Sequence, residues 1–387
     1  MTNVGKIKLA LIIAPSMFWI VIIATYLGQT KGLSTGEMFR LISLYYFFGM
    51  FLEYPTGVIG DYFSHKLSVI LGHFLCALAL VWLLYATGYI ELVAFYFLYA
   101  LGGAFLSGSD NALLYKHTNK FERELSDTNL FIGLVRFTEL ILAGFLAAKV
   151  SLEAPIMLSV ISSIMAIFIL LTVKTKKEDS KNKISFDDNF QSQDKLLKFG
   201  WKTFKGVLKN KTLLGAILLT ALLVSCFLMI KWLLNPFFVF LGLDVRLWGI
   251  IGGTSWLLIS FGSWLYPRLN KQFTSFRIII LVISGSLFLM GIHNIYLAVL
   301  GLGLLQITRG ITGVKTPSLL NNLADDDKRA SILSLSGVIR KIFSIILSFV
   351  IGYLLGITSF TGTLFILSFS IFIIGFTFLF GFKVSKY

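Results

Sequence analysis

The sequence predicts an all-α membrane protein with twelve transmembrane helices in two six-helix bundles. Hydrophobic residues make up 56% of the 387 residues and charged residues only 14%, which is too apolar for a water-soluble domain. The apolar residues form unbroken runs of about twenty, which is the length of a helix that crosses a bilayer. A transmembrane β-barrel would instead alternate apolar and polar residues over shorter segments. The runs therefore favour helices.

Twelve such runs follow one another along the chain, and one long hydrophilic stretch divides them six and six. We place the spans at about 7–28, 37–60, 67–87, 90–114, 128–149, 153–173, 212–240, 246–266, 276–292, 294–316, 331–355 and 360–382. The predicted organisation is an N-terminal bundle over 1–173, a linker over 174–211 and a C-terminal bundle over 212–387. The other loops are short, so consecutive helices are expected to run antiparallel.

The linker is rich in Lys and carries no Pro. We interpret it as a solvated connection between the two bundles. One part of it, from Leu196 to Leu208, interleaves Lys with Leu, Phe, Trp and Val. That pattern is compatible with a basic amphipathic helix on the membrane surface.

Positive charge is distributed unevenly over the predicted loops. Most of the 34 Lys and Arg lie on one side, whereas Lys31, Lys149 and Arg246 lie on the other. Because cytoplasmic loops are the basic ones, both termini and the linker are expected to face the cytoplasm. The net charge of +15 therefore reports orientation rather than nucleic-acid binding, and contact with anionic lipid headgroups is a secondary expectation.

The two halves carry a similar motif at the start of their fifth span. Gly133-Leu134-Val135-Arg136 in the first half matches Gly337-Val338-Ile339-Arg340 in the second. An arginine inside a membrane helix is costly, so its appearance at matching places indicates an internal duplication. Duplicated halves are typical of secondary transporters.

The loop after the second span carries the most specific motif. Gly57, Asp61 and Lys66 fit the pattern G-x-x-x-D-[RK]-x-G-[RK]-[RK], whereas Tyr62 and Ser64 stand where the pattern has a basic residue and a glycine. With twelve spans, inward termini and a long central loop, the whole chain resembles the major facilitator superfamily. The end of the fourth span, from Gly103 to Leu114, looks similar to that family as well. So does the loop between the tenth and eleventh spans, from Asp327 to Ser334.

The resemblance implies an alternating-access carrier whose two bundles rock about a central cavity lined by spans one, four, seven and ten. It also implies that Asp61 caps the eleventh helix and closes the cytoplasmic side. A carboxylate is favoured at a helix N-terminus, which makes that role physically reasonable. An ordinary turn residue beside a tightly packed glycine is the alternative.

Glu53 lies within the second span, on a stripe of small and polar residues. Loss of water around a carboxylate favours its neutral form, which suits reversible protonation and hence proton coupling. A structural carboxylate that pairs with a neighbouring arginine or caps the helix bend at Pro55 is an equally supported alternative.

Asp110, Arg136 and Glu139 form a second candidate coupling group. Asp110 and Arg136 are expected at similar depth on the fourth and fifth spans, and Glu139 follows Arg136 at i+3 on one helix face. Two acids that compete for one guanidinium could exchange partners as the bundles move. Structural ion pairing is the alternative. Arg340 is the matching candidate in the second half.

Several polar residues are candidates for the substrate cavity. From the fourth span we predict Tyr96, Tyr99 and Ser107. From spans seven and ten we predict Lys231, Asn235, Gln306 and Arg309. The cations would attract an anionic or zwitterionic substrate, although Lys231 could instead extend to the membrane interface.

The leading interpretation is a proton-coupled exporter of a small organic or drug-like compound. Uptake or exchange of a small organic anion is one alternative, and a receptor or assembly partner without transport activity is another. No phosphate-binding loop, metal-ligand cluster or catalytic constellation is visible, so we expect no enzyme activity and no cofactor besides a proton gradient. The expected setting is a monomer in a bacterial inner membrane.

Overall fold

The computed structural model describes residues 1–14, 17–62, 64–107, 109–118, 121–174, 207, 209–270, 272–323 and 329–382. The predicted amphipathic segment from Leu196 to Leu208 lies almost wholly outside this described part. Within it the regular structure consists of helices, which confirms the all-α prediction. Local hydrogen bonding in a helix satisfies the backbone without water, as lipid requires.

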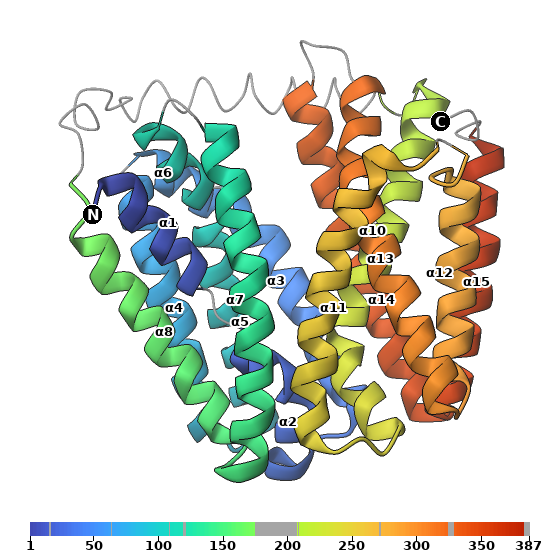
Figure 1. Cartoon of the computed structure of the whole chain (residues 1–387), viewed down its shortest axis with the longest axis horizontal. Helices are drawn as coiled ribbons and strands as arrows, with labels where there is room; N and C mark the ends of the chain where they lie inside the picture. The colour runs from blue at the N-terminus through green and yellow to red at the C-terminus, as the bar shows by residue number, and fades with distance from the viewer. Residues whose placement is uncertain are drawn as a thin grey trace. The chain divides into compact units, whose positions relative to one another are not determined.

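The helices of the first half follow the six predicted spans (Figure 1). The first span is divided into α1 (Asn3–Ile13), the 3-10 helix η1 (Phe18–Val21) and α2 (Ile23–Lys31). The remaining helices are α3 (Thr35–Tyr62), α4 (His65–Tyr85), α5 (Tyr89–Leu106), α6 (Ser109–His117), α7 (Phe121–Lys149) and α8 (Glu153–Leu171). α6 continues the fourth span after a short interruption.

The helices of the second half match the other six spans. They are α10 (Lys211–Phe240), α11 (Val245–Leu265) with the 3-10 helix η3 (Tyr266–Arg268), α12 (Phe276–Gly291), α13 (Ile295–Leu323), α14 (Arg329–Ile357) and α15 (Phe360–Gly381). Three helices contain an internal proline: Pro55 in α3, Pro236 in α10 and Pro317 in α13. Pro236 thus lies inside one continuous helix.

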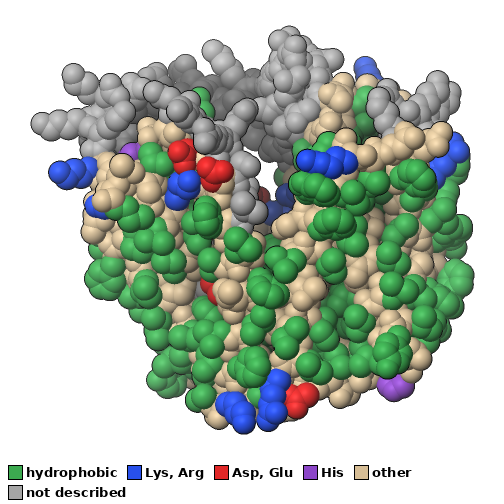
Figure 2. All heavy atoms as spheres, viewed as in Figure 1, with side chains coloured by type: hydrophobic (Ala, Val, Ile, Leu, Met, Phe, Trp, Pro, Cys, Tyr) green, Lys and Arg blue, Asp and Glu red, His purple; other side chains and the backbone are tan. Residues whose placement is uncertain are grey.

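The outer faces of the helices are apolar, as expected in hydrocarbon. Among the described residues, ten segments are long and apolar enough to cross a membrane, and α12 is a shorter apolar helix. Large hydrophobic side chains such as Phe168, Phe369 and Ile373 are exposed rather than buried. In Figure 2 hydrophobic side chains dominate the face in view, and Lys and Arg are sparse on it. The helices therefore bury polar groups inward and present apolar surface outward.

By contacts among the described residues, the chain falls into two compact units. Unit 1 comprises 1–183 and 234–256, and unit 2 comprises 184–233 and 257–387. α10 and α11 each contribute to both units, because the tip of their hairpin packs with the first half. The predicted domain boundaries at 173 and 212 stay predictions.

Helix pairing in unit 1 recurs in unit 2. α4 packs against α5 and α8, and α12 packs against α13 and α15, which are the corresponding spans. Glycines allow the close approach in both cases: a Cβ on Gly102 would lie 2.9 Å from the Gly72 carbonyl oxygen, and one on Gly301 would lie 2.7 Å from the Ser286 carbonyl oxygen. Small residues at such positions let membrane helices pack backbone to backbone. The repeat seen in the sequence is thus also a repeat of packing.

Candidate functional site

The first membrane span is broken in its middle. α1 ends at Ile13, and Ala14 has extended backbone angles of φ −131° and ψ 152°. The next residue in the sequence is Pro15, which has no amide hydrogen and disfavours helical angles in the residue before it. The break is therefore dictated locally. It leaves backbone groups inside the unit that need partners from other helices.

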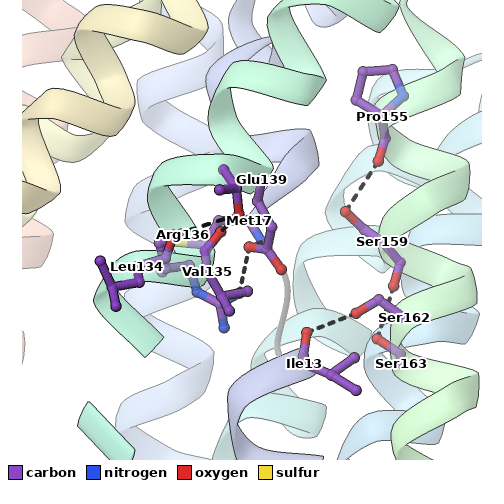
Figure 3. A network of polar contacts seen from close by, with 11 residues as sticks. Ile13, Met17, Leu134, Val135, Arg136, Glu139, Pro155, Ser159, Ser162 and Ser163 are labelled. Carbon is purple, nitrogen blue, oxygen red and sulfur yellow. Dashed lines mark hydrogen bonds and ion pairs between the residues drawn. The ribbon is translucent and has the colours of Figure 1, made fainter. Parts of the chain in front are cut away.

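Two side chains satisfy backbone groups on either side of this break (Figure 3). Ser162 Oγ of α8 donates to the Ile13 carbonyl oxygen at 2.9 Å. The Met17 amide donates to Glu139 Oε2 of α7 at 3.2 Å. Polar groups from two different helices thus replace the hydrogen bonds that the helix loses at the break.

Glu139 also forms an ion pair with Arg136 one turn earlier on α7. Arg136 is only 2% exposed and Glu139 only 5% exposed. The same oxygen, Glu139 Oε2, accepts from Arg136 Nη1 and from the Met17 amide. In a low-dielectric interior each charge depends on the other, since an unpaired charge there is very costly. The sequence offered Asp110 and Glu139 as rival partners of Arg136, and the described structure pairs Arg136 with Glu139.

Asn235 holds the far side of the broken span. Its Oδ1 accepts from the Thr25 amide at 2.6 Å and from Thr25 Oγ1 at 3.2 Å, and its Nδ2 donates to the Val21 carbonyl oxygen at 2.9 Å. Asn235 is 1% exposed. The sequence placed Asn235 in a substrate cavity. The structure shows Asn235 at the junction between η1 and α2, and its place in a cavity stays a prediction.

An aromatic cluster surrounds η1. The ring of Trp19 lies 5.1 Å from that of Tyr99 and 6.1 Å from that of Phe95, measured between ring centroids. Tyr45 of α3 joins the cluster, 6.0 Å from Tyr99 and 6.4 Å from Tyr96. The buried hydroxyl of Tyr96 has no hydrogen-bond partner within the part of the chain that the structure describes. Two predicted cavity residues, Tyr96 and Tyr99, thus lie together beside the broken span.

The other candidates of the first half lie elsewhere on unit 1. Glu53 Oε1 accepts from Ser107 Oγ at 2.9 Å, which joins α3 to the end of α5. Asp110 is half-buried in α6. Asp61 lies in the last turn of α3, and its side chain falls outside the described part. Glu53 and Ser107 are therefore brought together as a pair.

In unit 2 the predicted cavity residues lie on α10 and α13. Lys231 is half-buried, with its Nζ 5.4 Å from the ring centroid of Trp232. Gln306 is 1% exposed, and neither its amide nitrogen nor its amide oxygen has a partner among the described residues. Arg309 is half-buried on the same helix. The structure therefore gives Gln306 the least satisfied side chain of this set.

Arg340 differs from Arg136 despite the matching motif. Its side chain is exposed, whereas its carbonyl oxygen accepts from Ser225 Oγ at 2.9 Å and from Ser344 Oγ at 3.0 Å. Ser344 Oγ also donates to Ser225 Oγ at 3.1 Å. Neutral hydroxyls thus join α10 to α14. In contrast, a charged side chain, Glu139, joins α7 to the first span.

Sequence reasoning missed the residues that organise the break: Met17, Trp19, Thr25 and Ser162. Pro15 within the first apolar run was the available signal for a discontinuity. The partners could not be found in the same way, since they lie more than a hundred positions away along the chain. Among the described residues, no group of three His, Cys, Asp or Glu side chains could hold a metal ion.

Comparison with solved structures places this geometry on a known architecture. A nucleoside transporter, NupG, superposes with a TM-score of 0.82 at 14% identity, covering 98% of this chain and 99% of that one. A D-xylose-proton symporter gives 0.70 at 12% identity, with 97% and 95% covered. A peptide transporter, POT, solved in complex with sulfate gives 0.75 at 12% identity, with 99% and 95% covered. At these identities the likeness shows the fold.

The sequence itself matches a family model. No curated protein matches the chain. The model of the Major Facilitator Superfamily matches residues 9–348, which is most of the chain. This confirms the resemblance inferred from the second-loop motif and the twelve spans. The chain belongs to the major facilitator superfamily, and it is a multi-pass membrane transporter rather than an enzyme.

Proposed function

We propose that this protein is a proton-coupled secondary transporter that exports a small organic compound by alternating access. The observation that supports this most is the buried Arg136–Glu139 pair beside the broken first span. Ionisable groups inside membrane helices are expensive and commonly serve ion or substrate movement. A carboxylate that holds both a cation and a helix break can link protonation to a change in helix position.

Protonation of Glu139 has two consequences in this arrangement. It removes the negative charge that balances Arg136, and it weakens the acceptor for the Met17 amide. The guanidinium then needs another anion, and the segment at Met17 loses one of its anchors. A proton can therefore change both the local charge and the constraint on the first span.

The aromatic content of the chain, with 37 Phe, 14 Tyr and 7 Trp, supports an organic substrate with an apolar part. Aromatic rings present large rigid surfaces to planar or lipophilic compounds. Among the structures with the same fold, one is described as a D-xylose-proton symporter, which names proton coupling for that protein. Export by this chain, with both termini in the cytoplasm of a bacterial inner membrane, is proposed from its loop charges and aromatic content.

Exchange or uptake of a small organic anion is the second candidate. Lys231 and Arg309 place positive charge on two membrane helices of the second half, and this favours a carboxylate or phosphate group on the substrate. A receptor without transport activity is the third candidate, since Tyr62 and Ser64 depart from the loop motif of the family.

Proteoliposomes with a trapped pH-sensitive dye would test the proposal. Lipophilic amines and aromatic carboxylates are added one at a time, with and without a pH gradient. Coupled export predicts proton movement with an amine or neutral compound, whereas anion exchange predicts flux of the carboxylate without a proton signal. Glu139→Gln should abolish the proton signal, and Glu153→Gln at the start of α8 should leave it unchanged. A protein that moves none of these compounds and no protons would contradict both transport proposals.

A further inference from the structure

A groove of about 620 Å³ opens on unit 1 where α1 and α7 begin. It is lined by residues of the N-terminus, α1 and α7: Met1, Thr2, Val4, Gly5, Lys8, Leu9, Ile12, Glu124 and Phe131. All of these residues belong to a single unit, so the groove depends only on packing inside it. Its volume is in the range of small-molecule sites.

An ion pair lies at one end of this groove. Lys8 Nζ of α1 is 2.6 Å from Glu124 Oε2 of α7, and both side chains are partly exposed. Glu124 lies in the charged first part of α7, whose sequence from Glu122 to Asp127 carries acids and an arginine, whereas Phe131 lies in the apolar part that follows. Seven residues of helix separate the two positions by about 10 Å along the axis. The pair therefore lies at headgroup depth.

The floor of the groove is apolar. Leu9 and Ile12 follow Lys8 toward the middle of the first span, and Phe131 exposes 51% of its surface beside them. The groove thus has a charged end at headgroup depth and an apolar end within the hydrocarbon. This is the polarity of a membrane lipid, with its headgroup at one end and its acyl chain at the other.

We propose that this groove binds a zwitterionic phospholipid whose headgroup carries a primary ammonium, as in phosphatidylethanolamine. Lys8 would donate to the lipid phosphate, and the ammonium would donate to the Glu124 carboxylate. Each charge of the protein pair then meets an opposite charge of the lipid. An acyl chain covers Leu9, Ile12 and Phe131.

The charge pair discriminates between headgroups. A choline headgroup has no hydrogen to donate to Glu124, so it offers charge without a hydrogen bond. A glycerol headgroup is anionic overall and brings no cation to Glu124. The Glu124 carboxylate then repels the lipid phosphate. The linker segment from Leu196 to Leu208 is another conceivable occupant, because it combines Lys with apolar residues. The chemistry of the pair favours the ethanolamine lipid.

The test compares the melting temperature of the full chain in detergent after addition of ethanolamine, choline or glycerol phospholipids with identical acyl chains. A ligand that binds only the folded protein raises its melting temperature. The ethanolamine lipid should give the largest rise, and native mass spectrometry should show it retained on the protein. Equal rises for all three lipids would overturn the proposal.

Variants separate a built site from general solvation. Lys8→Ala and Glu124→Ala should each remove the preference for ethanolamine, whereas the exchanged pair Lys8→Glu with Glu124→Lys should restore it. Ile12→Trp should reduce retention by filling the apolar floor. Lys66→Ala, which alters a lysine bound to the Leu171 and Val173 carbonyls, is the matched control. A preference that survives in both alanine variants refutes the site.

The linker alternative gives a distinct result. If the chain's own segment occupied the groove, lipid preference would appear only after residues 190–206 are deleted. That outcome would overturn the proposal for the intact protein. Because none of these measurements uses transport, their failure would not affect the proposed transport function.

Discussion

The backbone amide of Met17 donates to Glu139 Oε2, and the same oxygen accepts from Arg136. One carboxylate therefore joins the interrupted first span to Arg136, its ion-pair partner among the described residues. A change in the charge of Glu139 must act on both partners at once.

Glu139→Gln should uncouple transport from the proton gradient. The amide oxygen can still accept from Met17, but the positive charge of Arg136 stays buried without a counter-charge. Removing one partner of a buried pair costs about 3–5 kcal/mol. We expect a lower melting temperature and flux that no longer responds to pH, measured in proteoliposomes with the dye assay. Flux that keeps its full pH response would exclude Glu139 as the coupling group.

Removing both charges should be less harmful to folding than removing one. In Arg136→Met combined with Glu139→Gln no unpaired charge remains, so stability should recover toward the wild-type value. Melting temperatures of the two single variants and the double variant form the required cycle. Additive losses of stability would mean that the two side chains act independently.

Asn235→Ala should loosen the junction between η1 and α2. It removes the acceptor for Thr25 and the donor to the Val21 carbonyl, and each buried group left unsatisfied costs about 1–3 kcal/mol. In its protonated form the side chain of Asn235→Asp keeps a carbonyl acceptor for Thr25 and has a hydroxyl that can donate to Val21, so at low pH its melting temperature should fall less than that of the alanine variant. Equal stability of wild type and Asn235→Ala would show that water replaces these hydrogen bonds.

Gly249→Ala should separate α11 from α7. A Cβ at this position would clash with the Leu140 carbonyl of α7, and backbone cannot move aside as a flexible side chain can. Overpacking of this kind costs about 1–3 kcal/mol.

Gly285→Ala in α12 is the matched control, because a Cβ there meets no atom within 4 Å. Alanine favours helix over glycine by about 0.5–1 kcal/mol, so this variant should be unchanged or slightly more stable. Similar melting temperatures for the two variants would contradict the close approach of α7 and α11.

The internal repeat can be compared with the described helices. The four-residue match aligns Arg136 with Arg340, whereas the C-terminal ends of α7 and α14, Lys149 and Ile357, lie 208 positions apart. The same offset along the chain aligns Arg136 with Ser344 and Met17 with Ser225. Ser344 and Ser225 are indeed bonded to each other. Residues one turn apart share a helix face, so a short motif can shift by a turn without changing the apolar pattern.

The sequence by itself determined the helices, the membrane and the superfamily. Helical hydrogen bonds are local and lipid permits little else, so apolar runs of the right length are sufficient evidence. The second-loop motif around Asp61 then identified the family, which the family model confirmed.

Only the tertiary structure decided the partners of the polar residues. Arg136 pairs with Glu139, and Asn235 binds Thr25 and Val21, while its place in a substrate cavity stays a prediction. These contacts join residues far apart in the chain, such as Met17 and Glu139 or Thr25 and Asn235. Helical periodicity shows which face a side chain lies on, but the partner it meets there depends on how distant helices pack together.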